Sequence, residues 1–375
     1  MKPAASEEFA LAPGLIQLNH ASYGLASRTV ADAAAKHRRR IESDPTRYLG
    51  AELTEDLRAR TVHMCRAFGL TPRHTALCSN ATSGAAAIIA SVPLAPADTV
   101  VVLDTEYSSI NRAWQVACKR AGARYIEIAV PLPFQGTASL LSRLENEVPG
   151  PVSYLQTSLI SSSAALRLPV AEIADWARGR GGHLILDAAH GPGHVPIAPD
   201  TWGVAAVFGT LHKWLPAERA VGFLWLTEQL VDRVRPAEVS LTWDSADLVE
   251  RFSWPGTFDP VPRLCLGAAV AQWVRWEHEG RLTECEELAD HATATLEALA
   301  RPTAGREYLP PRLRSFILDG VTVTEVKSAL SKADMRAWVG PGPSGECLLR
   351  IATHVYNDRG DIAALAELLE EVLHP

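Results

Sequence analysis

Short apolar runs alternate with helix-period segments through the first two thirds of the chain, and this alternation constrains the fold most. Several runs are almost continuously apolar, as strands buried on both faces of a sheet must be. Strands separated by helices indicate an open, largely parallel sheet with helices on its faces. The seven expected strands are Thr75–Ser79, Thr99–Asp104, Arg124–Ala129, Val152–Thr157, His183–Asp187, Ala205–Gly209 and Val221–Leu226. The helices expected between them are Ser83–Ser91, Ile110–Ala121, Ser139–Glu147 and Val170–Gly179.

The pattern changes after about Pro255, where long helical segments replace the alternation. Helices are expected over Arg263–Glu279, Arg281–Ala300 and Asp361–Leu373, with a strand over Leu348–Ala352. We therefore expect an N-terminal segment (1–18), a large domain (19–255) and a smaller C-terminal α+β domain (256–375).

Charge and composition exclude several classes of protein. The 36 Lys and Arg residues against 43 Asp and Glu leave a formal net charge of −7, which disfavours nucleic acid as a main partner. The one basic cluster, Lys36 to Arg40, lies on a helix-like stretch and is interpreted as a solvated face. The most apolar region, Ala81–Leu103, is interrupted by two prolines and an aspartate, so it cannot cross a membrane.

The N-terminus and the cysteines favour a cytoplasmic protein. Glu7 and Glu8 stand where a signal peptide requires an apolar stretch. The six cysteines are scattered, without CxxC pairs or metal-ligand spacing, which is typical of buried thiols in a reducing compartment. We expect no metal bound by His183, His190 and His194, because Gly191-Pro192-Gly193 prevents a helical pair of ligands.

Ligands of open α/β sheets bind beyond the carboxyl ends of the strands, so the residues just past each expected strand are the candidates for a site. After the first strand, Asn80-Ala81-Thr82-Ser83-Gly84 opens a helix with small side chains. Such a helix start lets an anion approach free backbone N–H groups, although an ordinary N-cap accounts for the same pattern. Tyr107 follows the second strand and offers either an aromatic plate or a packing residue.

Two further strand ends carry reactive groups. Asp187 ends the most apolar strand, where a carboxylate is costly to bury without a partner. Lys213 lies in Thr210-Leu211-His212-Lys213-Trp214, where apolar neighbours lower the pKa of an amine and make it a nucleophile. An anion cradle, an aromatic plate, a buried acid and a desolvated lysine together match pyridoxal 5′-phosphate (PLP), whose lysine-bound form needs an acid at the pyridine nitrogen.

These residues stand in motifs that resemble the fold-type I, class V aminotransferase-like PLP enzymes, in the isopenicillin N epimerase-like branch. The resemblance runs from about Leu18 to Leu373. It is carried by Leu18–Gly24 (LNHASYG), Asn80-Ala81-Thr82, Glu106-Tyr107, Leu168-Pro169-Val170, Leu186–His194 (LDAAHGPGH), His212–Leu215 (HKWL), Trp254–Thr257 (WPGT) and Leu349-Arg350-Ile351. It implies the PLP-transferase fold of type I, a seven-stranded mostly parallel sheet flanked by helices, with the smaller C-terminal domain beside it.

The resemblance also implies residue roles. Lys213 would hold the cofactor covalently and shuttle the Cα proton, Asp187 would keep the pyridine nitrogen protonated, and His190 would hydrogen-bond near the 3-hydroxyl. The other cofactor contacts would be Tyr107 on the ring, Ala81, Thr82, Thr210 and His212 at the phosphate, and Thr257 reaching the phosphate from the second subunit of a homodimer with shared active sites. The amino-acid substrate would meet Arg350, which would clamp its α-carboxylate, and Asn19, His20 and Tyr23.

Two positions depart from the branch. Phe258 stands where the branch usually has arginine, and Leu159 where it often has histidine. Both changes remove polar groups from the expected site region. They favour a substrate whose far end is bulkier or less anionic than that of the epimerase.

The reaction type stays open among several kinds of Cα chemistry. Elimination, epimerisation, transamination and decarboxylation share their first carbanion, so the shared residues do not separate them. We place a C–S lyase acting on a cysteine S-conjugate in secondary or thiol metabolism first, an epimerase second and a transaminase or decarboxylating deaminase third. A cysteine desulfurase needs a thiol on a mobile loop, whereas Cys347 lies in an expected strand. The chain lacks the GxSxG motif that a serine hydrolase would have, which disfavours that class. A non-catalytic PLP-binding regulator is a remote alternative.

Overall fold

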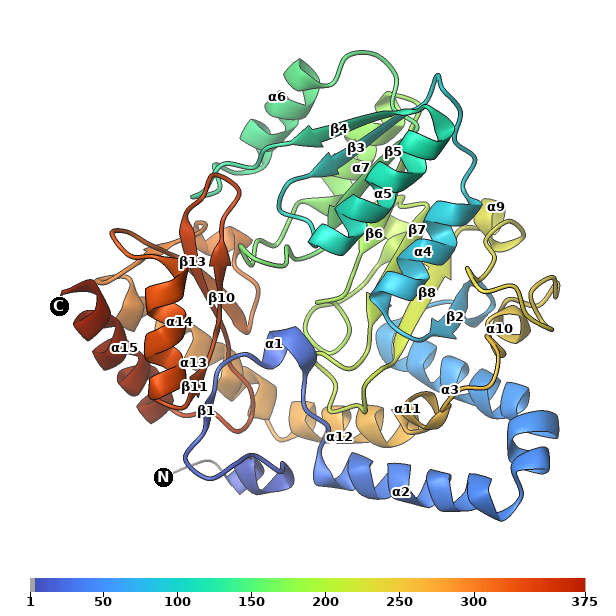
Figure 1. Cartoon of the computed structure of the whole chain (residues 1–375), viewed down its shortest axis with the longest axis horizontal. Coiled ribbons are helices and arrows are strands. Elements are labelled where there is room, and N and C mark those ends of the chain that lie inside the picture. Colours follow the sequence, from blue (N-terminus) through green and yellow to red (C-terminus); the bar gives the residue numbers. More distant parts are fainter. Residues whose placement is uncertain (1–3, 375) are drawn as a thin grey trace.

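A seven-stranded sheet forms the centre of the larger part of the molecule in the computed structural model, which describes residues 4–374 (Figure 1). In spatial order its strands are β2 (Thr75–Cys78), β8 (Gly222–Leu226), β7 (Ala206–Thr210), β6 (His183–Asp187), β5 (Tyr154–Ser158), β3 (Thr99–Leu103) and β4 (Arg124–Ile128). Neighbouring strands are parallel except β8, which is antiparallel to β2 and β7. The predicted α/β fold with a mostly parallel seven-stranded sheet is therefore confirmed.

Helices cover both faces of this sheet because its strands are apolar on both sides. Along β3, Val100 and Val102 pack into one buried cluster with α4 (Ala81–Ser91) and α5 (Ser108–Ala121). Val101 and Leu103 point the other way, into a larger cluster with residues of α6 (Thr137–Glu147) and α7 (Val170–Gly179). The same larger cluster includes residues of α2 (Arg28–Ser43) and α3 (Leu53–Phe68). The basic stretch from Lys36 to Arg40 lies within α2, as predicted.

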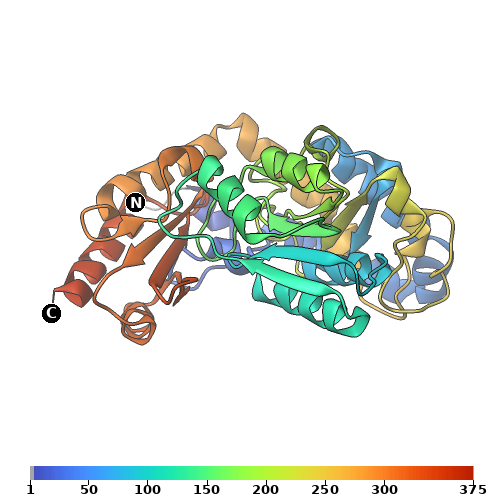
Figure 2. The ribbon, with the colours of Figure 1, turned by 90° about the horizontal axis from the view of Figure 1, so that it is seen from above.

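A second sheet lies at the other end of the molecule, as the view from above shows (Figure 2). It is antiparallel, in the order β12 (Trp338–Pro341), β13 (Cys347–Ala352), β10 (Leu313–Leu318) and β9 (Arg301–Pro302). Its apolar core includes residues of α13 (Arg281–Leu296), α14 (Val323–Lys332) and α15 (Arg359–Leu373). Near the N-terminus, β1 (Ile16–Gln17) pairs in parallel with β11 (Met335–Arg336). The boundaries at residues 18 and 255 stay predictions.

The long helix expected over Arg263–Glu279 is two helices, α11 (Val261–Leu264) and α12 (Leu266–His278), divided at Cys265. Pro262 occupies the first turn of α11, where a missing N–H costs nothing. Among the described helices, none is both long and apolar enough to cross a membrane.

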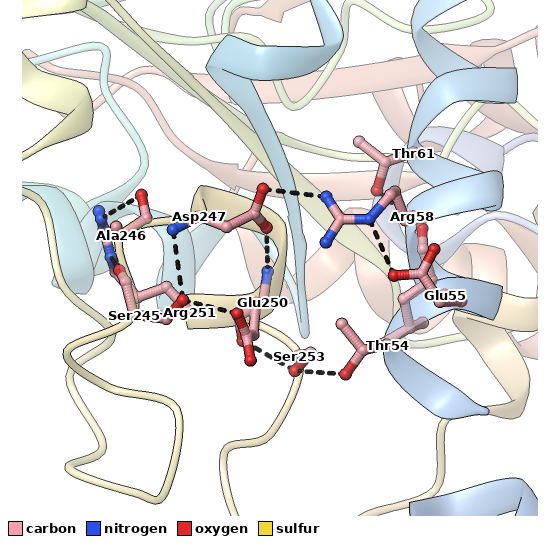
Figure 3. Close-up of polar contacts among 11 residues, drawn as sticks. Thr54, Glu55, Arg58, Thr61, Ser245, Ala246, Asp247, Glu250, Arg251 and Ser253 are labelled. Carbon is pink, nitrogen blue, oxygen red and sulfur yellow. Dashed lines mark hydrogen bonds and ion pairs between the residues drawn. The ribbon is translucent and has the colours of Figure 1, made fainter. Parts of the chain in front are cut away.

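Arg251 holds the segment that connects β8 to α11 (Figure 3). The side chain ends α10 (Leu248–Arg251) and is almost fully buried. Its guanidinium donates to the main-chain carbonyls of Val231, Val234, Ser245 and Ala246. Nearby, Asp247 accepts from the Arg58 guanidinium at 3.0 Å and from the Glu250 amide at 2.8 Å, which ties the segment to α3. An arginine satisfied by four carbonyls orders a long connection whose regular structure is limited to two four-residue helices, α9 (Glu228–Val231) and α10.

Candidate active site

A cavity of about 370 Å³ opens at the carboxyl ends of the parallel strands, between the large sheet and the C-terminal one. The predicted site residues that line it are Tyr23, Ala81, Thr82, Tyr107, Asp187, His190, Thr210, His212, Lys213 and Arg350. The other lining residues are Ala21, Ser22, Asn80, Ser158, Ile160, Ser162, Ala189 and Trp338. Fold topology therefore brings together side chains that the sequence places as far as 327 residues apart (350 − 23).

Lys213 and Asp187 are the two reactive groups of the cavity. Burial lowers the pKa of Lys213 to about 8, opposed by the charge of Asp187 and assisted by that of Arg350. Burial raises the pKa of Asp187 to about 6, although the Ala189 amide donates to its Oδ1 at 2.7 Å and Lys213 lies nearby. A lysine with this pKa has a sizeable neutral fraction at neutral pH and is a competent nucleophile.

His190 lies beside the amine. Its Nε2 is 3.3 Å from Nζ of Lys213, and the ring is buried. Burial, together with the charges of Lys213 and Arg350, holds the pKa of His190 well below its usual range. The imidazole is therefore neutral and offers one donor and one acceptor.

The start of α4 forms the opposite wall of the cavity. Asn80 caps the helix, accepting from the Ser83 amide at 2.9 Å while its own amide donates to the Ser83 hydroxyl at 3.1 Å. The amides of Ala81 and Thr82 are the first two of the helix, so no carbonyl within the helix can accept a hydrogen bond from them. Exposed amides and the positive end of the helix dipole make this a site for a phosphate group.

Two glycines allow the main chain to close around this region. A Cβ on Gly222 of β8 would lie 2.7 Å from the main chain of Asn80. Gly24, at φ +63°, approaches the carbonyl of His212 so closely that any side chain would overlap it. His212 is itself held by the Thr210 hydroxyl at 2.7 Å and by the main chain of Val221.

The cavity fits PLP. It offers an amine for the aldehyde, a buried carboxyl for the ring nitrogen, a half-exposed aromatic ring at Tyr107 and a helix start for the phosphate. Burial and donor chemistry, rather than any single motif, carry this assignment.

Arg350, on β13, reaches the cavity from the C-terminal sheet. Its side chain is only 3% exposed, and burial lowers its pKa to about 10. The guanidinium donates to the carbonyl of Ser162 and to the Ser22 hydroxyl at 2.9 Å, and it lies 5.3 Å from the ring centre of Trp338. Among the residues from 4 to 374, no carboxylate forms an ion pair with it.

Three predicted site residues lie outside the cavity lining. Asn19 stands behind Arg350 and accepts from Ser22 Oγ at 2.6 Å. His20 is fully buried, stacked on His354 at 3.7 Å between ring centres and bonded through Nδ1 to the Tyr356 hydroxyl at 2.8 Å. Thr257 is exposed, and its predicted contact across a subunit interface stays a prediction.

The two departures from the branch pattern do not line the cavity. Leu159, which directly follows β5, is buried in the larger apolar cluster, whereas its neighbour Ile160 lines the cavity. The Phe258 ring lies 4.7 Å from the guanidinium of Arg263, which is buried.

Sequence reasoning missed Ser158 and the buried acid behind it. The amide of Ser158 donates to Glu106 Oε1 at 2.9 Å and its hydroxyl to Oε2 at 2.6 Å. Burial raises the pKa of Glu106 to about 8, assisted by the charge of Asp187. Glu106 appeared in a sequence motif, but its contact with the end of β5 depends on the fold.

All six cysteines are buried and free, and none lines the cavity. Within the described part of the chain, no group of three or more His, Cys, Asp or Glu side chains has the geometry to hold a metal ion.

Comparison with known proteins agrees with this geometry. Residues 28–365 match the model of the family "Aminotransferase class-V". The isopenicillin N epimerase of Amycolatopsis lactamdurans is 26% identical over 391 residues, covering 98% of each chain. A probable cysteine desulfurase of Chlamydia muridarum is 27% identical over 297 residues, covering 73% of this chain and 72% of that one. A solved C-DES variant with glycine covalently linked to its PLP cofactor shares the fold, with a TM-score of 0.83 at 19% identity over 98% of this chain and 99% of that one.

The family match spans most of the chain, and the cavity supplies the groups that the cofactor needs. The cofactor is PLP. The chain belongs to the class-V aminotransferase family of PLP-dependent enzymes.

Proposed function

We propose that the protein is a cytoplasmic C–S lyase that cleaves a cysteine S-conjugate by β-elimination. The observation that carries the proposal is Arg350, a buried cation with no anionic partner among residues 4–374, facing the cavity that holds Lys213. A buried charge of this kind is costly unless a ligand compensates it. The α-carboxylate of an amino acid fits its guanidinium fork.

The chain's own groups perform the proton transfers of this reaction. PLP, when bound, withdraws electrons from the substrate Cα, and Asp187 sustains this by keeping the ring nitrogen cationic. The amine of Lys213 would take the Cα proton. The Cβ–S bond then breaks with its electron pair leaving on sulfur, which picks up a proton. With one water consumed, the products are a thiol, pyruvate and ammonia.

The side chains that line the cavity favour a neutral sulfur substituent. Tyr23, Ile160 and Trp338 contribute apolar surface to this lining. Among residues 4–374, Arg350 and Lys213 are the only Lys or Arg side chains in the lining, and both have the roles above. No further Lys or Arg of the described lining is left to bind a second carboxylate on the substrate.

The cysteines favour a lyase over a desulfurase. A desulfurase needs a cysteine that receives the sulfur atom, yet none lines the cavity. Cys347 is buried on β13, where burial raises the pKa of its thiol. The relatives include both desulfurases and L-cysteine desulfhydrases, which act on the same class of bond.

The test is product analysis with a panel of S-alkyl and S-aryl cysteines. We expect pyruvate, ammonia and thiol in equal amounts, with no product from Lys213→Ala. The epimerase relatives make inversion at Cα the second candidate. Inversion of a D- or L-amino acid without pyruvate would overturn the lyase and favour that candidate.

A homodimer with shared active sites completes the proposal. Thr257 is exposed and does not line its own cavity, and the same connection between β8 and α11 carries Val239 and Leu241, which are 80% and 87% exposed. Large exposed apolar side chains of this kind mark association surfaces. Mixing inactive Lys213→Ala with inactive Thr257→Glu subunits tests it. If subunits exchange freely, one site in each mixed dimer is intact and activity returns to about a quarter of wild type. No recovery after proven exchange would refute shared sites.

A further inference from the structure

The indole of Trp214, next to the reactive lysine, makes a hydrogen bond that defines the chemistry of His190. The indole is fully buried, and its Nε1 lies 3.1 Å from Nδ1 of His190. An indole N–H only donates, so Nδ1 of His190 must accept and carries no proton. Because burial keeps this histidine neutral, its proton resides on Nε2.

The orientation of that proton matters because Nε2 faces the reactive amine. Nε2 is 3.3 Å from Nζ of Lys213, so the N–H of His190 donates and the amine accepts. An amine that accepts is neutral, which is the state a nucleophilic lysine requires.

Trp214 is itself held in place from behind. His194 stacks on its ring at 3.8 Å between centres, and the Arg312 guanidinium lies 5.0 Å from the ring centre. The Arg312 amide donates to Nε2 of His194 at 3.0 Å, which leaves Nδ1 of His194 to donate to the carbonyl of His190 at 3.2 Å. The hydrogen bonds from the Trp214 indole, the Arg312 amide and Nδ1 of His194 therefore each run in a defined direction.

We propose that Trp214 is a positioning residue, whose indole N–H holds His190 as the Nε2–H tautomer and turns the single donor of that ring toward Lys213 and the cofactor. The alternative role for Trp214 is apolar filling of the core, which phenylalanine would largely satisfy. The proposal rests on the cofactor and on Lys213, and it holds for any of the Cα reactions considered above.

The test compares Trp214→Phe with Trp225→Phe in the holoenzyme. Trp225 is equally buried, and its indole N–H has no partner among the described residues, so this control loses the same atoms without the hydrogen bond. The first readout is ¹⁵N NMR of histidine-labelled protein, with His190→Asn identifying the signal. We expect a bare Nδ1 in wild type and in Trp225→Phe, and an Nδ1–H or mixed tautomer in Trp214→Phe.

The second readout is the pH profile of the bound-cofactor absorbance. Besides the cofactor, the groups whose charges act on His190 are Lys213, Arg350 and His194. We expect Trp214→Phe, but not Trp225→Phe, to move the midpoint of this profile by about half to one pH unit. The same variant should lower kcat roughly tenfold with KM little changed, a loss at the upper end of what one hydrogen bond contributes.

A tautomer and absorbance profile in Trp214→Phe that match wild type would overturn the proposal. If Trp214→Phe does not fold, the spectrum of the wild type is a sufficient test, because a protonated Nδ1 of His190 in it would overturn the proposal. Neither NMR result depends on the substrate, so failure here is distinct from failure of the C–S lyase proposal.

Discussion

Removal of the Arg350 guanidinium is expected to abolish substrate recognition while leaving the cofactor in place. In Arg350→Gln the substrate carboxylate loses a buried, fork-shaped partner, and loss of one member of a buried charge pair costs about 2–5 kcal/mol. Since about 1.4 kcal/mol is a factor of ten, kcat/KM should fall by roughly 30- to 4,000-fold. Arg350→Lys keeps the charge without the fork and should lose less.

The assay is pyruvate release from an S-alkyl cysteine across a range of concentrations, beside PLP affinity measured by absorbance. The thermal stability of Arg350→Gln is measured beside these, because the carbonyl of Ser162 loses its donor in this variant. Arg314→Gln is the matched control, because Arg314 is a buried arginine of β10 that pairs with Asp290 at 2.7 Å and does not line the cavity. A change in stability for both variants with kcat/KM unaltered in Arg350→Gln would refute the carboxylate clamp.

Three further predictions concern other parts of the molecule. Asp187→Asn should inactivate the enzyme yet stabilise the cofactor-free protein above pH 6, because burial raises the pKa of Asp187 to about 6, and a buried acid that must ionise opposes folding. Because that pKa is raised from 3.8, the gain in free energy of unfolding should be about 3 kcal/mol above pH 6 and should disappear below pH 4. Chemical denaturation of variant and wild type at pH 4 and pH 7.5 measures this gain. An equal difference between the two proteins at both pH values would contradict the prediction. Cys347→Ser should retain full pyruvate release, whereas loss of activity would point to a sulfur-accepting cysteine. Arg251→Met should lower the free energy of unfolding by about 3 kcal/mol, because buried carbonyls lose their donor. An unchanged denaturation midpoint would contradict the organising role inferred for Arg251, whose surroundings Figure 3 shows.

The strands of the large sheet were predictable because burial on both faces makes them apolar throughout. The exact ends of these strands were less predictable. The strand expected over Val152–Thr157 runs from Tyr154 to Ser158, because Ser158 is fixed by Glu106 from a distant loop. The start of α4 moved from Ser83 back to Ala81, because Asn80 and Ser83 cap each other across the first turn.

The C-terminal sheet was harder to predict because its strands contain buried polar residues. In β10, Arg314 and Ser315 interrupt the apolar run, and only the fold supplies Asp290 as the partner of Arg314. Sequence reasoning therefore identified one strand of this sheet, β13, and no other.

The candidate site divides in the same way. Lys213 and Asp187 were predictable because each directly follows or ends a strand of the sheet, and carboxyl ends of parallel strands share an edge. Trp338 was missed because it reaches the cavity from β12, whose position depends on pairing with β13. The contact between Trp214 and His190 was also beyond the sequence, although both residues stood in recognised motifs.

The assignment of Lys213 as the residue that carries PLP is the central claim, and borohydride reduction tests it most directly. Reduction of the purified holoenzyme followed by peptide mass spectrometry should find the pyridoxyl group on the peptide containing Lys213, and Lys213→Ala should show no label while retaining its fold. A label on any other lysine, or an unlabelled Lys213 in protein that has bound PLP, would contradict the account.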